Sequence, residues 1–179
     1  MIRGQSLIRN GAHLDYAMLM SGNTVKTKKP ELLRYQGSEG RRHLIEALRA
    51  NSLVQERPLA AAFARRAKLR SVPVGQPLIK AGSRGRELFL ILNGKFAVKS
   101  DGRMVAQAGP GQYVGEIGLL DGKGRRTAAV IALSDSIVAR IKAKDFRELA
   151  DQHPRLWRTI AATLALRILD GASVTTPKS

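Results

Sequence analysis

At Leu69 the chain changes from a helical repeat of apolar residues to a series of short runs that suit β-strands. Turn-forming pairs separate these runs, above all Asn93-Gly94 and Asp101-Gly102, because both residues of such pairs tolerate the positive φ of tight hairpins. The runs expected as strands are Arg70–Val74, Pro77–Lys80, Glu87–Leu92, Lys95–Lys99, Arg103–Gln107, Arg126–Leu133 and Ser136–Lys142. Short strands at this spacing predict an all-β roll or barrel.

Helical patterns flank the β-rich stretch on both sides. Before it, apolar residues at helical spacing predict helices over about 40–50 and 58–67, and His13–Met20 suits a further short helix. After it, we expect a short helix over Asp145–Gln152 and a longer one over Pro154–Asp170, which begins with proline. The longer helix carries a continuous apolar stripe, and we expect its Trp157 to pack against the roll and not against a ligand.

These patterns divide the chain into three parts. Residues 1–68 form a basic N-terminal extension with helices, and residues 69–170 form the roll with its C-terminal helices. Residues 171–179 are a linker-like tail, which we expect to lead to a further domain. No apolar run is long enough for a membrane span, and the N-terminus lacks the pattern of a signal peptide.

The formal net charge of +17 is divided almost evenly between the residues before Ser71 and those after it. Such a charge attracts polyanions, so a basic nucleic-acid-binding protein, or a transcription-regulator fragment with a degenerate roll, stays open as the alternative function. The chain has no cysteine, which fits the cytoplasmic location that we expect. Its three histidines lack metal-ligand spacing, and no nucleophile–base motif is present. We therefore expect no metal, no cofactor and no catalytic residue in this chain.

The segment Gly115–Val130 carries the most chemical information. Gly115 lets the backbone approach a ligand closely, and a short turn of helix then presents free N–H groups that suit an anion. Arg126 offers a bidentate fork that matches a phosphate. The carboxylate of Glu116 has two acceptor oxygens for a hydroxyl, such as a ribose 2′-OH.

This segment resembles the phosphate-binding cassette of cyclic-nucleotide-binding domains, the fold shared by bacterial catabolite activator proteins, protein kinase A and G regulatory regions and cyclic-nucleotide-gated channels. The residues that match the family spacing are Gly115, Glu116, Gly118, Leu119, Leu120, Arg126, Thr127, Ala128 and Val130. The resemblance implies a mainly β fold with flanking helices: an eight-stranded, jelly-roll-like antiparallel β-roll with N-terminal helices and a C-terminal lid helix.

The resemblance also implies a role for each residue of the cassette. Arg126 would bind the cyclic phosphate and Glu116 the ribose 2′-OH. The backbone of Gly115, Ile117 and Gly118 would line the sugar-phosphate, and Thr127, followed by Ala128, would offer its hydroxyl. The family spacing places the phosphate contact at Arg126. The neighbouring Arg125 is therefore expected to carry a charge at the surface or one step away from the ligand.

Two regions of the expected pocket differ from the family or are less well defined. Val114 stands where the family often has a large aromatic residue, which alters the lining near the sugar. The lid would come from the helix over Pro154–Asp170, with Leu164, Arg167 and Ile168 as its contributors. The ligand would be a cyclic nucleotide monophosphate, cAMP, cGMP, cUMP or cCMP.

The helices ahead of the roll, together with the segment Asp151–Ala161, resemble bacterial single-roll receptors fused to a C-terminal effector. Among these are the TIR-domain effectors of cyclic-pyrimidine anti-phage signalling. The resemblance implies a receptor that regulates a fused or partner effector domain and that forms a homo-oligomer through its helices.

Overall fold

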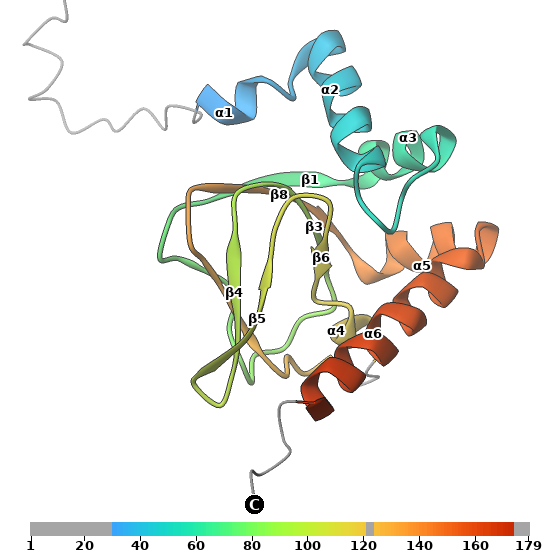
Figure 1. The fold of residues 1–179 in the computed structure, drawn as a ribbon. Coiled ribbons are helices and arrows are strands. Elements are labelled where there is room, and N and C mark those ends of the chain that lie inside the picture. Colours follow the sequence, from blue (N-terminus) through green and yellow to red (C-terminus); the bar gives the residue numbers. More distant parts are fainter. Residues whose placement is uncertain (1–29, 121–123, 174–179) are drawn as a thin grey trace, which may run out of the picture.

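The computed structural model describes residues 30–120 and 124–173 and confirms a mainly β fold with flanking helices (Figure 1). Its strands are β1 (Lys68–Val72), β2 (Pro77–Ile79), β3 (Leu88–Asn93), β4 (Phe96–Ser100), β5 (Arg103–Ala108), β6 (Tyr113–Val114), β7 (Ala129–Ala132) and β8 (Ser136–Ile141). Its helices are α1 (Pro30–Leu33), α2 (Gly37–Arg49), α3 (Arg57–Arg66), α4 (Ile117–Leu120), α5 (Ala143–Gln152) and α6 (Arg155–Ser173).

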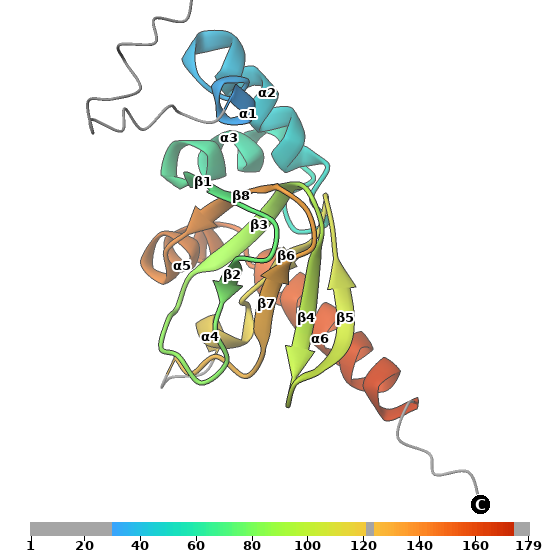
Figure 2. The same ribbon diagram turned by 90° about the vertical axis from the view of Figure 1, so that its left-hand side faces the viewer.

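The strands form two four-stranded antiparallel sheets, in the orders β1-β8-β3-β6 and β2-β7-β4-β5. Consecutive strands therefore alternate between sheets at several points, as a roll requires. Helices α2 and α3 lie at one end of the roll, and α6 runs along its side (Figure 1 and Figure 2). The expected eight-stranded antiparallel roll with flanking helices is confirmed.

One core lies between the two sheets. Its buried side chains come from both sheets and are mostly aliphatic: Val72, Leu78, Ile79, Phe89, Ile91, Phe96, Ala108, Val114, Val130, Ala132 and Val138. Because side chains alternate along a strand, the neighbours of these residues on β1, β3 and β8 face the opposite side of the first sheet. Burial of both sides explains why β3 is a continuous apolar run.

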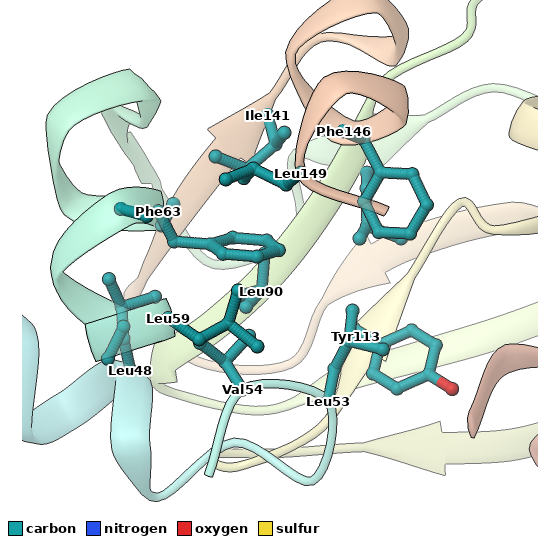
Figure 3. Close-up of a cluster of buried hydrophobic side chains, with 14 of the residues drawn as sticks. Leu48, Leu53, Val54, Leu59, Phe63, Leu90, Tyr113, Ile141, Phe146 and Leu149 are labelled. Atoms are coloured by element: carbon teal, nitrogen blue, oxygen red, sulfur yellow. The ribbon is translucent and has the colours of Figure 1, made fainter. Parts of the chain in front are cut away.

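A second core lies between the outer face of the first sheet and the helices (Figure 3). Leu48 of α2, Phe63 of α3 and Phe146 of α5 contribute fully buried side chains to it. Trp157 of α6 packs edge-on against Phe146, with ring centroids 5.1 Å apart, and Phe146 packs likewise against Phe63. Trp157 thus packs, half-buried, against this core, and the packing fixes α5 and the start of α6 against the sheet.

Several element boundaries differ from those expected. The first strand runs over Lys68–Val72 and not Arg70–Val74, because Pro73 lacks an N–H and Gly75 forms a turn at φ +77°. Strand β6 was not expected, since two residues between glycine-rich turns show no periodicity. Helix α6 continues past Gly171 to Ser173.

Some expectations fall on residues outside the described ranges. These are the helix over His13–Met20, most of the tail over 171–179 and the cassette residues 121–123. In the described part of the chain, no helix combines the length and the apolar character that a membrane crossing needs.

Candidate functional site

Arg126 lies at the centre of the expected cassette, and its side chain is only 5 % exposed. Its guanidinium donates to the carbonyl oxygens of Gly115 and Glu87, each at 2.9 Å, and to Glu87 Oε2 at 3.0 Å. Burial lowers the pKa of the Arg126 guanidinium, and the Glu87 carboxylate opposes this effect. The site therefore keeps a buried cation in place with one carboxylate and two carbonyl groups.

The backbone of Arg126 is held as firmly as its side chain. Its N–H donates to the carbonyl of Ser83 at 2.9 Å, and its own carbonyl accepts from Gly82 at 2.8 Å. These bonds to the loop before β3 explain why β7 begins at Ala129 and not at Arg126, as expected from the sequence. Arg126 thus precedes the strand that it was expected to open.

Glu87 was not among the expected site residues. Its Oε2 bonds Arg126, and its other carboxylate oxygen, Oε1, lies 4.0 Å from Nη1 of Arg140 on β8. In the sequence, Glu87 is a single acidic residue directly before the apolar run Leu88–Leu92. Such a residue is as typical of the exposed end of a strand as of a binding site. Only the fold brings Glu87 to Arg126, 39 positions away.

Glu116, the expected acceptor for a ribose hydroxyl, is 3 % exposed and lies directly before α4. Its carboxylate is paired with the guanidinium of Arg167 on α6, 51 positions away. Arg167 also donates to the carbonyl of Tyr113 at 3.2 Å and lies over the Tyr113 ring. The expected lid residue Arg167 is therefore in direct contact with the cassette.

Tyr113 forms a second link between the roll and α6. Its hydroxyl donates to Oγ1 of Thr163 at 2.8 Å, and Thr163 in turn donates to the carbonyl of Thr159. Burial raises the pKa of the Tyr113 hydroxyl above its usual value. The cassette and α6 are thus joined by an ion pair and by a chain of hydroxyl groups.

Two glycines of the cassette lie where no side chain fits. Gly115 has φ +93°, and a Cβ there would lie 2.7 Å from the carbonyl oxygen of Glu87 and 2.8 Å from Arg126 Nη1. At Gly118, a Cβ would lie 2.6 Å from the carbonyl oxygen of Gly85. Both glycines let the turn at α4 pack directly against Arg126 and the loop before β3.

The remaining expected residues lie around this centre in different environments. Ile117, Thr127 and Arg125 are exposed, and Ala128 is half-buried. Val114 is 2 % exposed and belongs to the core between the sheets, while Leu164 is packed partly against the helix-side core. The side chain of Ile168 lies outside the described part of the structure. Within that part, no group of His, Asp or Glu side chains could hold a metal ion.

Comparison with protein families identifies the domain that contains these residues. Residues 69–153 match the model of the cyclic nucleotide-binding domain. This segment belongs to the cyclic nucleotide-binding domain family. The matched range includes β1 to β8, α4 and α5, and with them both Glu116 and Arg126.

Curated relatives extend the likeness to the N-terminal helices. The chain is 37% identical over 138 residues to the Pycsar effector protein XpPycTIR of Xanthomonas perforans. The matched segment covers 76% of this chain and 46% of that relative. It is 35% identical over 136 residues to the Pycsar effector protein PaPycTIR of Pseudomonas aeruginosa. The chain thus spans about half the length of these relatives.

Solved structures share the fold. A cAMP-bound PfPKA-R structure matches with a TM-score of 0.69 and 20% identity, over 77% of this chain and 48% of that one. The catabolite activator protein of Thermus thermophilus matches with a TM-score of 0.56 and 29% identity, over 62% of this chain and 54% of that one. The first likeness supports the fold alone.

Proposed function

We propose that this chain is a receptor module for a cyclic nucleotide monophosphate, and that ligand binding regulates an effector domain, fused or in a partner chain. The observation that carries the proposal is the pairing of a buried arginine and a buried glutamate across a glycine-lined turn. Arg126 and Glu116 are 5% and 3% exposed, and buried charged side chains are uncommon and gather at functional sites.

The chemistry of the two groups fits the two polar ends of a cyclic ribose phosphate. Arg126 would donate a charge-assisted fork to the phosphate, and Glu116 would accept the ribose 2′-OH. The backbone of Gly115, Ile117 and Gly118 would lie against the sugar-phosphate, because no Cβ at either glycine intervenes. The exposed Thr127 would contribute its hydroxyl at the rim of the site.

The contact between Arg167 and Glu116 suggests how binding would reach α6. A ribose hydroxyl at Glu116 must share its carboxylate with Arg167 or displace it. Either event changes the ion pair that ties α6 to the cassette, so α6 would shift as a lid. A ligand can drive such a shift only if it binds one position of α6 more tightly than the other.

The relatives suggest which effector is regulated. The names of the Pycsar effector proteins, together with the resemblance to TIR-domain receptors, favour a TIR-type effector of bacterial antiviral signalling. In this proposal the described chain acts in the cytoplasm, binds the second messenger and catalyses nothing, and the effector carries any enzymatic activity.

Self-association through helices is a further part of the proposal. On α6, the apolar side chain of Leu166 is 62% exposed and would lie in such a contact. A second copy of this chain would cover it. Light scattering of the Leu166→Asp variant should then show a smaller particle than the unaltered chain, and an unchanged size would contradict a contact through α6.

The proposed site is tested by a pair of adjacent arginines. Arg126→Ala removes the buried cation and should weaken cyclic nucleotide binding by at least about 2–5 kcal/mol, as for other buried charge pairs that lose one partner. Arg125→Ala removes an equal charge from an exposed position and should change binding much less. Isothermal titration calorimetry on both variants decides the matter. The reverse order of effects would show that the phosphate is not at Arg126.

A further inference from the structure

A hollow of about 270 Å³ lies beside Arg126 but away from the cassette turn. Neither α6 nor any residue from Gly115 to Leu120 lines it. The charged side chains that line it are Arg70, Lys80, Arg84, Arg126, Arg140 and Glu87, so that a single carboxylate faces five cations. The hollow is therefore a strongly positive feature that a receptor for one cyclic nucleotide does not require.

The strand pattern shows that these cations interrupt a core. Along β1, Val72 faces the space between the sheets and Arg70 has the same orientation two residues earlier. Along β8, Val138 faces this space and Arg140 follows it on the same side. At one end of the roll the inward positions thus change from valine to arginine on two paired strands.

This change carries an energetic cost. Arg140 stands directly opposite Lys68 in the register of β1 and β8, and like charges in opposite positions destabilise a sheet. The lining carboxylate, Glu87, is shared between two arginines, with Oε2 bonded to Arg126 at 3.0 Å and Oε1 at 4.0 Å from Arg140. Local departures of this kind from a well-packed pattern mark functional positions. A bound anion would relieve the repulsion.

We propose that this hollow is a second anion site, which binds a small ligand carrying a pyrophosphate group. Arg70, Lys80, Arg84 and Arg140 would contact the two phosphate groups. A single monoanion would leave most of this charge unmatched, whereas a pyrophosphate carries several negative charges on a compact frame. The volume is slightly below the range of about 300–1,000 Å³ for drug-sized ligands, which favours a compact group.

The position of Arg126 couples the hollow to the cassette. Its guanidinium lines the hollow and is also the group proposed to bind the cyclic phosphate. Two anions that draw on one guanidinium compete for it, so each should weaken binding of the other by the same factor. Pyrophosphate in the hollow would then lower the affinity of the receptor for its messenger.

The test uses inorganic pyrophosphate, titrated calorimetrically at fixed ionic strength. The Arg70→Gln/Lys80→Gln variant removes two exposed cations of the hollow, and Lys95→Gln/Arg103→Gln removes two exposed cations elsewhere. The first variant should weaken pyrophosphate binding at least about tenfold and the control less than about threefold, because only the first loses charge-assisted contacts. Equal weakening of both, or no saturable binding by the unaltered chain, would overturn the proposal.

A second titration separates this proposal from the receptor function. Cyclic nucleotide should bind Arg70→Gln/Lys80→Gln within about threefold of the unaltered chain, since neither residue lies in the cassette. Saturating pyrophosphate should weaken nucleotide binding to the unaltered chain at least about threefold, by the same reciprocity. An unchanged nucleotide affinity would overturn the shared use of Arg126. Failure of nucleotide binding in every variant would count against the receptor function and not against the hollow.

Discussion

A methyl group added at Gly118 should disturb the site more than its small size suggests. In Gly118→Ala the new Cβ would lie 2.6 Å from the carbonyl oxygen of Gly85 and 2.8 Å from Arg126 Nη1. Ordinary van der Waals contact begins at about 3.4 Å, so both neighbours must move by several tenths of an ångström, or the turn at α4 must move away from them. Gly85 cannot move alone, because its N–H donates to the carbonyl of Gly124 at 2.9 Å, and Gly124 directly precedes Arg125 and Arg126 in the chain.

The expected cost follows from this geometry. Overpacking of a close-packed site costs about 1–3 kcal/mol, and the better helix propensity of alanine returns up to about 1 kcal/mol. We therefore expect Gly118→Ala to lower the free energy of unfolding by about 1–2 kcal/mol. We also expect cyclic nucleotide binding to fall at least about tenfold, because the guanidinium of Arg126 is displaced from the phosphate position.

Gly109→Ala is the matched control. A Cβ at Gly109 would meet only the carbonyl oxygen of Gly94, at 3.9 Å, so this substitution adds the same methyl without a clash. Its unfolding free energy should stay within about 0.5 kcal/mol of the unaltered chain. Urea denaturation and calorimetric titration of both variants provide the comparison. If Gly118→Ala matches Gly109→Ala in both, the close packing at Arg126 does not govern the site.

Three further substitutions test individual contacts. Glu116→Ala should weaken binding of the ribose nucleotide but leave its 2′-deoxy analogue nearly unchanged, and equal weakening of both in competition binding would make Glu116 structural. Glu87→Gln leaves the buried Arg126 without its carboxylate and should lower the free energy of unfolding by about 1–3 kcal/mol in urea denaturation, so an unchanged value would argue against the pair. Thr127→Ala should change the ranking of the four bases by no more than about tenfold, since Thr127 is exposed and the net contribution of one hydrogen bond is only about 0.5–1.5 kcal/mol; a complete switch of preference in competition binding would contradict this.

The fold was predictable because its signals are local. The hairpin turns at Asn93-Gly94 and Asp101-Gly102 fix β3, β4 and β5 within one residue of the expected bounds. Gly94 and Gly102 adopt the positive φ that these turns require. Strand β6 could not be predicted in this way, because it is held by its pairing with Phe89 and Leu90 and not by its own pattern.

The cassette residues were proposed from their resemblance to a known family, whereas their charge partners had no such signal. Glu116 and Arg126 stand ten positions apart at the family's spacing, and both are buried. Their charge partners Glu87 and Arg167 come from distant segments that only tertiary packing brings together. Arg167 was expected as a lid residue from its helix, but its ion pair with Glu116 has no signature in the sequence.

The second anion site illustrates the same limit. Arg70 and Arg140 lie 70 positions apart in the sequence. Each occupies a polar position in the alternating pattern of its strand, so the sequence predicts that each side chain faces solvent. Their common orientation becomes visible only when β1 pairs with β8 in register. Sequence periodicity describes one strand at a time, and charge repulsion across two strands is a property of the pair.

Thermal denaturation with each of cAMP, cGMP, cCMP and cUMP tests the receptor function most directly. A ligand at about 100 times its Kd should stabilise the chain by roughly 2.7 kcal/mol, which corresponds to about 5–10 °C in Tm for a domain of this size. We predict that at least one of the four nucleotides produces this shift, and that Arg126→Ala abolishes it while Arg125→Ala does not. If none of the four raises Tm, or if the shift survives in Arg126→Ala, the chain does not bind a cyclic nucleotide through this cassette.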